Sequence, residues 1–553
     1  MNKSNTEWFK SGLPWIWLTA GAVSISLIMV IGLVLLIATR GLGQFWPGEV
    51  ISLQYQAGGN ERVSLLGEIV DHEHVNAPRL REQGIDVPEG IDRVDRFLLK
   101  RGNRDLTGLD FQWILATNMG EQTRPEDVIV IEREEWGNFY GYLNEVKESG
   151  KPITKNQWQA LQDRIQRKQH LSEQIKHIEK DLIGKINYKV EKLRLKERRL
   201  QLDNITDKAP YTAIEKERAE LHKEYASFQA QLAKLYQDIN RDSITVSTGE
   251  GQKIDLPLSK VRRVYQPNKM SWLEKSQFYL TKMGEFLFDE PREANTEGGI
   301  FPAIFGTVLM VLIMSVLVTP FGVVAAIYLH EYAHKGPLTR MIRIAVNNLA
   351  GVPSVVYGVF GLGFFVYFLG GHIDQLFFPE ALPAPTFGTP GLLWSSLTLA
   401  ILTVPVVIVA TEEGLSRIPR SIREGSLALG ATKAETLWRT VLPMASPAMM
   451  TGLILAVARA AGEVAPLMMV GVVKLAPSLA VDANYPFLHL DRKFMHLGFH
   501  IYDVGFQSPN VEAARPMVYA TALTLIALII VLNFAAIRIR NRLRDKYITS
   551  AQS

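Results

Sequence analysis

The chain has 553 residues, a formal net charge of +4 and no cysteine. This length allows several domains, and the lack of cysteine excludes disulfides, thiol catalysis and cysteine-bound zinc. The small net charge does not predict a nucleic-acid partner, and we expect none. Apolar residues are concentrated near the N-terminus and in the C-terminal half, whereas residues 41–296 are mostly charged and polar.

The first predicted element is an apolar stretch at residues 15–38. It is long enough for the roughly 20 residues with which a helix crosses a bilayer. It exceeds the apolar part of a secretory signal, and no convincing cleavage site follows it. We therefore expect a retained membrane anchor.

Residues 41–296 predict a separate α+β region. Strand-like patterns occupy residues 50–56, 62–70, 127–131, 243–247 and 252–256. Between them, residues 156–203 and 212–239 are helical in pattern and are separated by Ala209-Pro210. The second of these stretches carries a heptad seam, interrupted by Arg218, at Ile214, Leu221, Tyr225, Phe228, Leu232, Leu235 and Ile239. We predict an antiparallel helical hairpin of roughly 70 Å on a β-rich base. It would act as a spacer or self-association element, with a docking site for a partner protein as the alternative.

Five further apolar stretches follow, at residues 300–329, 341–369, 391–410, 445–472 and 513–537. Positive charges gather after the first, third and fifth of these, at Lys335, Arg340, Arg343, Arg417, Arg420, Arg423, Lys433, Arg439, Arg538, Arg540, Arg542, Arg544 and Lys546. Residues 370–390 contain no lysine or arginine. Because positive charge marks cytoplasmic loops, we expect both termini in the cytoplasm and residues 41–296 in the periplasm.

Two histidine motifs suggest metal sites. Asp71-His72-Glu73-His74 would place both histidines on one face of a strand, but two ligands without a third favour a solvated surface. His330-Glu331-Tyr332-Ala333-His334 matches H-E-x-x-H, in which two histidines on one helical face bind zinc and the glutamate acts as base. A membrane-embedded zinc metalloprotease is therefore one alternative function. Gly336-Pro337 should end this helix at once and no third-ligand motif follows, so we expect no metal and no cofactor.

The segment from Arg423 to Pro443 predicts two short helices around a turn. Gly430 supplies the permissive backbone that a helix stop and turn need. The segment follows the pattern E-A-A-x3-G-x9-I-x-L-P, with Gly-Ser in place of Ala-Ala and Thr440 in place of Ile. The matching positions are Glu424, Gly425, Ser426, Gly430, Leu442 and Pro443. The pattern is similar to the coupling loop by which ABC-importer permeases dock on their ATPase.

Arg459 and Glu463 lie inside the predicted span at residues 445–472. Ionisable side chains are costly there and tend to face a cavity or a partner. Four residues apart on a helix, the two side chains share a face and can pair. Arginine offers an oxyanion a planar, permanently charged fork, and the glutamate would hold it between transport events. The alternative is a buried ion pair that only locks helix packing.

Five motifs mark the C-terminal half. They are Gly298-Gly299-Ile300-Phe301-Pro302, Thr319-Pro320-Phe321-Gly322-Val323, Gly351-Val352-Pro353-Ser354-Val355-Val356-Tyr357-Gly358, Thr411-Glu412-Glu413-Gly414-Leu415 and Ala458-Arg459-Ala460-Ala461-Gly462-Glu463-Val464-Ala465-Pro466-Leu467. Together they resemble the PstA-type permeases of phosphate-specific ABC transporters. The last motif is the most specific, because PstC-type subunits usually lack its Ala-Pro-Leu. Residues 41–296 lie outside the resemblance and look like a large insertion after the first span.

The resemblance implies a mainly α fold, in which a six-helix, MetI-like permease domain of a type I ABC importer accompanies the α+β region. It implies a permease subunit of an ATP-driven phosphate importer in the bacterial inner membrane. Arg459 and Glu463 would lie on the substrate pathway, and Glu412 and Glu413 would support the pathway or the coupling loop. The implied partners are a PstC-like permease, a PstB-like ATPase dimer, a periplasmic phosphate-binding protein, a PhoU-like regulator, inorganic phosphate and membrane lipid.

The chain itself has no G-x-x-x-x-G-K-[ST] loop, so ATP hydrolysis falls to a partner and we do not expect an enzyme. A coiled-coil envelope scaffold remains a further alternative. The predicted domain order starts with the N-terminus and first span at 1–40, the base at 41–154, the hairpin at 155–240 and a return to the base at 241–296. The permease domain follows at 297–540, with a coupling loop at about 412–443, and a basic cytoplasmic tail ends the chain at 541–553.

Overall fold

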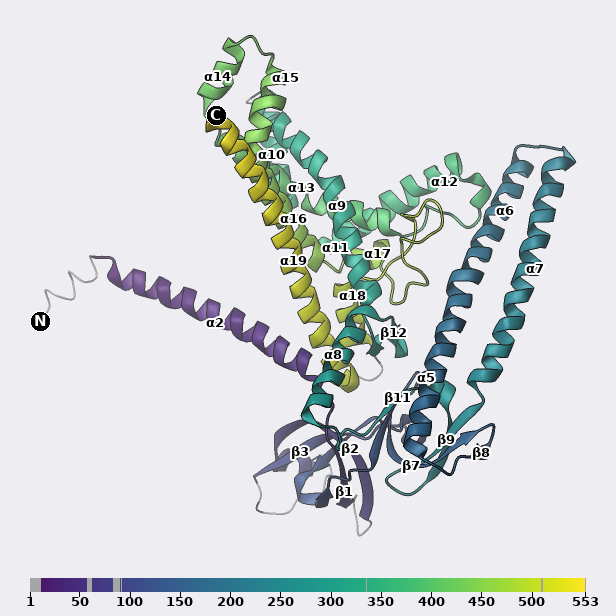
Figure 1. Ribbon diagram of the computed structural model, residues 1–553. Coiled ribbons are helices and arrows are strands. Elements are labelled where there is room, and N and C mark those ends of the chain that lie inside the picture. Colours follow the sequence, from purple (N-terminus) through teal and green to yellow (C-terminus); the bar gives the residue numbers. More distant parts are fainter. Residues whose placement is uncertain are drawn as a thin grey trace, which may run out of the picture.

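The computed structural model describes residues 11–56, 62–82, 90, 92–334, 336–508 and 511–552. Lys335, one of the charges that predict the orientation, lies outside these residues. Figure 1 shows a β-rich base at one end of the molecule and a bundle of long helices above it. A helical hairpin rises from the base beside the bundle, and the N-terminal helix α2 leans away from the bundle.

Helix α2 (Leu13–Gly43) contacts the rest of the chain near its C-terminal end. There Gly41 lies so close to α19 (Val511–Gln552) that a Cβ atom would come within 2.9 Å of the Ala520 backbone nitrogen. Most of the other α2 side chains are apolar and exposed. Such a helix is stable only with its sides covered by lipid or by a partner.

The base contains two antiparallel sheets. The first has the order β4-β3-β2-β1-β5, with β1 (Val50–Gln56), β2 (Arg62–Asn76), β3 (Arg93–Lys100), β4 (Phe111–Leu115) and β5 (Met119–Thr123). The second has the order β10-β9-β7-β6-β11, with β6 (Val128–Arg133), β7 (Asn138–Glu148), β9 (Asp242–Ser247), β10 (Lys253–Pro257) and β11 (Val261–Tyr265). Strand β8 (Lys151–Pro152) pairs with β7. Short helices α3 (Ala77–Glu82) and α4 (Arg104–Thr107) join strands of the base, as do the 3₁₀ turns η1 (Ala116–Asn118) and η3 (Leu258–Lys260).

The sequence pattern predicts β1, β2, β6, β9 and β10 and misses the other strands. The register places Ser247 of β9 opposite Tyr142 of β7 on one side and opposite Lys253 of β10 on the other. The second sheet buries an apolar core that includes Ile129, Phe139 and Ile244. Leu161 and Ile165, from the first helix of the hairpin, also lie in this core. The root of the hairpin is therefore part of the base.

The predicted helical hairpin is confirmed. Its first arm is continuous through α5 (Gln157–Lys176), the π-helical turn η2 (His177–Ile183) and α6 (Gly184–Leu202), and its second arm is α7 (Lys208–Ile239). The arms bury a small apolar cluster at Ile186, Leu193, Ile214 and Leu221. Arg218, the polar interruption of the seam, pairs across the hairpin with Glu197.

The predicted separator Ala209-Pro210 is wrong, because both residues lie in the first turn of α7. Proline is tolerated there, since the amides of a first turn have no partner within the helix. Asp207 caps this helix by accepting a hydrogen bond from the Ala209 amide at 3.1 Å.

After the base, α8 (Trp272–Phe288), the strand pair β12 (Pro291–Arg292) and β13 (Glu297–Gly298), and η4 (Glu293–Asn295) lead to the membrane half. Its helices are α9 (Phe301–Ile327), η5 (Tyr328–Tyr332), α10 (Pro337–Leu349), α11 (Ser354–Phe360), η6 (Gly361–Gly370), α12 (Gly371–Phe377), η7 (Pro379–Ala381), α13 (Leu392–Ser416), α14 (Arg420–Ala428), α15 (Lys433–Thr436), η8 (Leu437–Val441), α16 (Leu442–Gly462), α17 (Leu467–Val470), α18 (Leu497–Tyr502), η9 (Asp503–Gln507) and α19. Among the described residues, six helical segments are long and apolar enough to cross a membrane: Pro14–Gly43, Phe301–Tyr332, Ser354–Phe377, Leu392–Ser416, Lys433–Gly462 and Ala514–Arg542.

The predicted span at residues 341–369 is wrong, because it merges two elements. The structure has the separate helix α10, then a break at Ala350, and a span that begins only at Ser354. Pro353 lacks an amide hydrogen and disfavours helical backbone at the preceding residue, which accounts for the break. All described α10 side chains are at least partly exposed, and its apolar and polar residues segregate to opposite faces.

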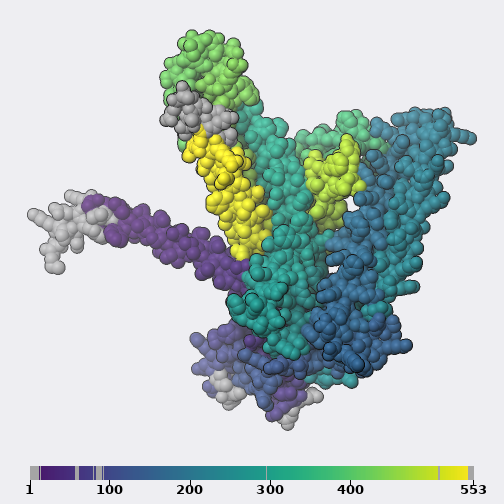
Figure 2. Space-filling model, viewed as in Figure 1, coloured from purple at the N-terminus to yellow at the C-terminus, as the bar shows by residue number. Residues whose placement is uncertain are grey.

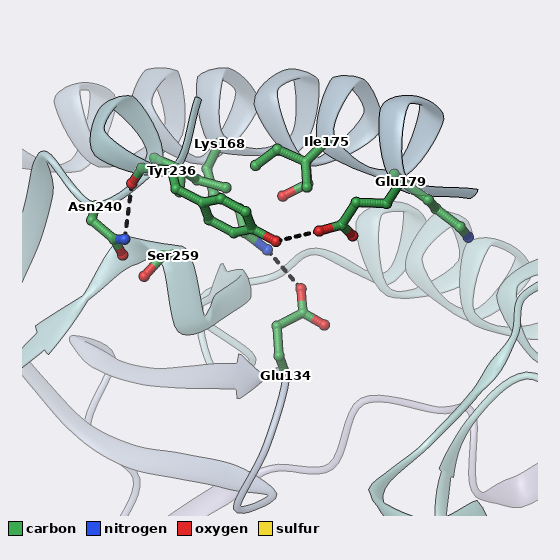
Figure 3. A pocket seen from close by; sticks show the side chains of 10 residues that line it. Glu134, Lys168, Ile175, Glu179, Tyr236, Asn240 and Ser259 are labelled. Carbon is green, nitrogen blue, oxygen red and sulfur yellow. Dashed lines mark hydrogen bonds and ion pairs between the residues drawn. The ribbon is translucent and has the colours of Figure 1, made fainter. Parts of the chain in front are cut away.

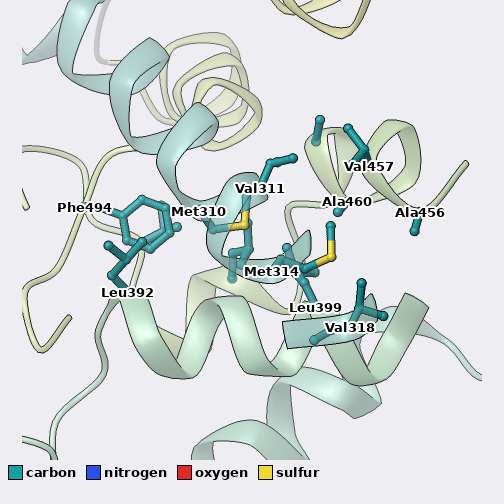
Figure 4. Close-up of a cluster of buried hydrophobic side chains, with 14 of the residues drawn as sticks. Met310, Val311, Met314, Val318, Leu392, Leu399, Ala456, Val457, Ala460 and Phe494 are labelled. Carbon is teal, nitrogen blue, oxygen red and sulfur yellow. The ribbon is translucent and has the colours of Figure 1, made fainter. Parts of the chain in front are cut away.

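Helix α13 lies at the centre of the membrane half. Its buried side chains, including Leu392 and Leu399, pack against Met310 and Met314 of α9 and against Ala460 of α16 (Figure 4). Small residues bring the helices close, as membrane helices require. A Cβ at Gly322 would meet the Val407 side chain at 2.6 Å, and one at Gly452 would meet Ala410 at 2.6 Å. The core therefore holds α9 and α16 on either side of α13.

Candidate functional site

The helix that carries Arg459 stops inside the predicted span, so the prediction of one helix over residues 445–472 is wrong. Helix α16 ends at Gly462, and Glu463 has extended backbone with φ −81° and ψ 130°. Pro466 then caps the short helix α17. Proline cannot donate the helical hydrogen bond and disfavours helix at the residue before it, which explains the interruption. Glu463 lies at the helix end and not on its face.

Arg459 and Glu463 nevertheless form an ion pair. Arg459 Nε lies 3.5 Å from Glu463 Oε1, and the two side chains remain 35% and 22% exposed. This distance is longer than the roughly 2.7–2.9 Å of a strong charge-assisted hydrogen bond. Within the described part of the chain, Arg459 makes no other ion pair and no hydrogen bond through its side chain. Most donors of the guanidinium are therefore unused.

Two of the sequence motifs meet at this break. Gly358 of α11 lies against Pro466, and a Cβ at Gly358 would come within 2.8 Å of the Pro466 Cα. Its neighbour Tyr357 donates a hydrogen bond from its hydroxyl to the Leu349 carbonyl at 2.7 Å. The glycine is required because the backbones approach too closely for any side chain. The break in α16 is thus held against the start of the third span.

The segment at residues 420–441, called the knuckle below, forms the predicted pair of short helices. Gly430 sits between α14 and α15 with φ +88°, a backbone conformation that favours glycine. Thr432 begins the second helix with a capping box, in which its amide donates to Glu435 Oε2 at 2.9 Å. Ser426 Oγ and Thr436 Oγ1 are 2.9 Å apart and tie the two helices together.

The knuckle lies at the end of the molecule opposite the base (Figure 1). Three large apolar side chains are exposed on it, Leu427 at 47%, Leu429 at 91% and Trp438 at 72%. Exposed apolar residues grouped at one end of a protein mark an interaction surface.

One ion pair and two hydrogen bonds attach the knuckle to the ends of two membrane helices. Arg423 Nη2 lies 3.0 Å from Oε1 of Glu331, which is in η5, the continuation of α9, and it donates to the Leu415 carbonyl of α13 at 2.8 Å. Lys433 donates to the Glu331 carbonyl at 2.5 Å. A displacement of the knuckle would therefore be transmitted to α9 and α13. The sequence predicts Arg423 only as one of the cytoplasmic positive charges, and no sequence signal identifies Glu331 as its ion-pair partner.

Glu412 and Glu413 lie near the same end of α13 but have different surroundings. Glu412 pairs with Arg343 of α10 at 3.4 Å, whereas Glu413 and Arg417 form an exposed pair at 4.0 Å. Glu413 also lines a cavity of about 340 Å³ with apolar residues of α13, among them Pro405 and Val409. Neither carboxylate contacts the Arg459 pair.

The H-E-x-x-H string does not have the geometry of a zinc site. The helical turn ends at Tyr332, so His330 and His334 do not share a helical face. Glu331 is occupied by Arg423, and His330 Nδ1 lies 3.0 Å from Glu331 Oε1. Among the residues that the structure describes, no group of three metal-ligating side chains is found.

The part of the hairpin farther from the base contacts loops of the membrane half. Tyr188 of α6 donates to the Tyr485 carbonyl, and Arg199 lies 3.7 Å from Glu380. Within the loop around Tyr485, burial opposes ionisation of Asp482, but the Asn484 amide, Arg492 and His489 hold its pKa down at about 2. Arg492 Nη1 lies 2.7 Å from Asp482 Oδ2.

A cavity of about 380 Å³ lies between the hairpin and the second sheet of the base (Figure 3). Several of its polar groups are paired with each other. Lys168 Nζ lies 2.6 Å from Glu134 Oε1, and the Tyr236 hydroxyl donates to Glu179 Oε1 at 2.6 Å, which raises the pKa of Tyr236. Asn240 Nδ2 donates to the Tyr236 carbonyl at 2.9 Å. Because these groups are satisfied, we assign no ligand to this cavity.

Known proteins match the membrane half. Residues 318–545 match the family model of the binding-protein-dependent transport system inner membrane component. The chain is 34% identical over 244 residues to the phosphate transport system permease protein PstA 1 of Mycobacterium tuberculosis (strain CDC 1551 / Oshkosh), covering 44% of this chain and 71% of the relative. The chain belongs to the family of binding-protein-dependent transport system inner membrane components.

The phosphate transport system permease protein PstA of Mycobacterium leprae (strain TN) is 32% identical over 237 residues, covering 43% of this permease and 68% of the relative. Among solved structures, the MetNI methionine ABC transporter in an inward-facing conformation aligns with a TM-score of 0.33 and 18% identity, covering 44% of this chain and 94% of that chain. The family match and the six candidate spans among the described residues make the permease a multi-pass membrane subunit of an ABC importer. It is a transport component and not an enzyme, and such a permease works with an ATPase and a substrate-binding protein.

Proposed function

We propose that this permease is the PstA-type subunit of an ATP-driven importer of inorganic phosphate. The mycobacterial relatives are named as phosphate transport proteins, and their similarity to this chain covers less than half of its length. The observation that carries the proposal in the structure is Arg459, a partly exposed guanidinium held only loosely by Glu463 at the break in α16.

This arrangement suits the transient binding of an anion. A guanidinium stays charged at every physiological pH, and its fork of donors matches the oxygens of phosphate. Glu463 neutralises the charge when no anion is present, so that an uncompensated charge does not remain in the membrane half. Because the distance between Arg459 and Glu463 is long for an ion pair, a passing phosphate would displace Glu463 from Arg459 at little cost in free energy. Glu412 and Glu413 lie near the C-terminal end of α13, so in this proposal they support the knuckle and do not bind the substrate.

The knuckle supplies the connection to ATP hydrolysis in this proposal. Glu424, Gly425, Ser426 and Gly430 form its first helix and turn, and Leu442-Pro443 begin α16, which carries Arg459. We propose that the knuckle docks on a PstB-like ATPase through Leu429 and Trp438. Motion at the knuckle would then reach Arg459 along α16, and it would reach α9 and α13 through Arg423.

The remaining partners follow from the same proposal. A PstC-like permease would complete the pathway, a periplasmic phosphate-binding protein would deliver phosphate, and a PhoU-like regulator would act on the cytoplasmic side. In the bacterial inner membrane, the base at residues 41–296 would lie in the periplasm. Both termini and the knuckle would lie in the cytoplasm, because the base and the knuckle occupy opposite ends of the bundle (Figure 1).

The test is uptake of radiolabelled phosphate by proteoliposomes that contain the assembled importer and its binding protein. Arg459→Gln keeps a hydrogen-bonding side chain of similar length but removes the charge, so assembly should persist while uptake falls by at least about tenfold, equivalent to about 1.4 kcal/mol. Arg194→Gln, in the exposed Arg194–Glu191 pair of the hairpin, is the matched control and should leave uptake unchanged.

The double variant Arg459→Leu with Glu463→Leu separates a substrate role from a packing role. If the pair only stabilises the helices, two apolar residues should restore both assembly and uptake. Recovery of uptake in the double variant would therefore refute the pathway role. Uptake of sulfate in place of phosphate by the wild-type importer would refute the assignment of substrate while leaving the coupling arrangement intact.

A further inference from the structure

Helix α8 connects the base to the membrane half and has two different faces. Its N-cap is Ser271, whose hydroxyl and amide form a capping box with Glu274. It ends at Phe288, and β12, η4 and β13 then lead directly to the span that starts with α9. Figure 1 shows α8 beside the ends of α2, α9 and α19 that are nearest the base.

One face of α8 is fixed to the base by charge and by aromatic packing. Lys282 Nζ lies 2.5 Å from Glu132 Oε2, and Glu285 pairs with Arg263. The Phe278 ring packs on the Tyr265 ring with centroids 4.6 Å apart. These contacts determine which side of α8 faces the protein.

The other face is apolar and uncovered. Trp272, Leu273, Leu280 and Phe288 are 75%, 74%, 62% and 73% exposed, respectively. At about 100° per residue, the four side chains span an arc of about 160° around the helix, and Leu273 and Leu280 lie near its centre. Figure 2 shows this part of the chain on the near surface, beside α2. Four large apolar side chains on a single helix form a patch that a water-facing surface would not retain.

The neighbours of α8 identify what covers this patch. Phe45 and Trp46 lie just beyond the C-cap of α2, and their rings lie 6.2 and 6.1 Å from the Tyr279 ring. Phe45 also packs on Phe286, with ring centroids 5.1 Å apart. Aromatic side chains gather in this way where membrane spans leave the bilayer. The exposed face of α8 therefore continues the apolar surface of α2 at the level where both segments meet the membrane boundary.

We propose that α8 is an interfacial helix that inserts its Trp272, Leu273, Leu280 and Phe288 stripe into the lipid of the leaflet nearest the base. An amphipathic helix of this kind lies in the interface with its apolar side towards the acyl chains. Lys269 is exposed just before the helix and reaches the headgroup layer. The opposite, salt-bridged face of α8 fixes the base, and with it the root of the hairpin, at a set height above the bilayer. The proposal is independent of the transported substrate.

The absence of cysteine from the chain allows a direct test by site-directed spin labelling. Leu273→Cys and Leu280→Cys, each carrying a nitroxide, would be studied in the full importer in lipid nanodiscs. Val23→Cys on the exposed side of α2 gives the lipid reference, and Glu220→Cys on the hairpin gives the water reference. The measurement compares relaxation by oxygen, which concentrates in lipid, with relaxation by a water-soluble nickel chelate.

We expect both α8 labels to have an oxygen-to-nickel accessibility ratio near that of Val23 and well above that of Glu220. A ratio like that of Glu220 would overturn the proposal, because the stripe would then face water. Low accessibility to both reagents would also overturn it, since a protein partner would then cover the stripe. If one labelled variant does not assemble, Trp272→Cys reports on the same stripe.

Discussion

The conformation of Gly430 gives the most direct test of the knuckle. Its φ of +88° is strained for a residue with a Cβ atom, yet a Cβ built there meets no atom within 4 Å. The free-energy penalty for replacing Gly430 therefore comes from backbone strain and not from steric overlap. A non-glycine residue forced into such a region costs about 1–3 kcal/mol. Valine lies at the upper end of this range, because β-branched residues are the least tolerant of positive φ.

A penalty of about 2 kcal/mol shifts a conformational equilibrium roughly 30-fold. In Gly430→Val, the turn between α14 and α15 would relax away from its docked geometry in most molecules. We expect phosphate uptake to fall by at least about tenfold under this penalty. Membrane insertion should be normal, since Gly430 lies outside the helical segments that are able to cross the membrane. Uptake normalised to assembled complex, together with co-purification of the ATPase, measures both effects.

A substitution series identifies the cause. If backbone conformation decides, the loss of uptake should increase in the order Gly430→Asn, Gly430→Ala, Gly430→Val, because asparagine tolerates positive φ best. The matched control is Gly425→Ala in α14, where φ is not positive and the added Cβ also meets no atom within 4 Å. This control should be neutral or slightly stabilising. Wild-type uptake by Gly430→Val would refute the coupling role, and harmless alanine with harmful valine would refute the backbone explanation.

Three other outcomes are expected. His330→Ala and His334→Ala should each leave uptake near normal, and metal analysis of the purified protein should find no stoichiometric zinc; one zinc per chain, lost in either variant, would contradict this. Replacement of residues 184–231 by a short Gly/Ser bridge should preserve folding and basal phosphate uptake, because the deletion leaves Leu161 and Ile165 in the core of the base. Failure of uptake even with excess binding protein would show that the hairpin is essential rather than a spacer. A wider cut over residues 156–239 would open that core and should destabilise the base. The Asp482 pKa of about 2 is below its unfolded value of roughly 3.9, so the stability that ionised Asp482 gives its loop is present above about pH 4 and is lost as the pH falls towards 2. Hydrogen exchange in residues 480–489 should therefore accelerate over that range, and Asp482→Asn should abolish the pH dependence.

Much of the architecture could be predicted from the sequence because its signals are local. Long apolar stretches identify spans, a heptad seam identifies the hairpin, and Gly430 identifies the turn of the knuckle. Each of these signals is complete within a few turns of chain. Helix α8 also has a local signal, the Ser271–Glu274 capping box before an apolar run, although residues 272–288 are not among the predicted helices.

Other features were decided by tertiary structure. Strands β7 and β9 pair although the whole hairpin separates them in sequence, and no local pattern determines such a ladder. Arg423 and Glu331 form an ion pair across 92 positions of sequence, so either charge alone predicts only a cytoplasmic loop. The sequence of residues 458–467 is sufficient to predict a charged pair, Arg459 and Glu463, within the membrane half. A proline between apolar residues is compatible with either a kinked or an interrupted helix. Only the tertiary structure, in which Pro466 packs against Gly358, shows that α16 is interrupted there.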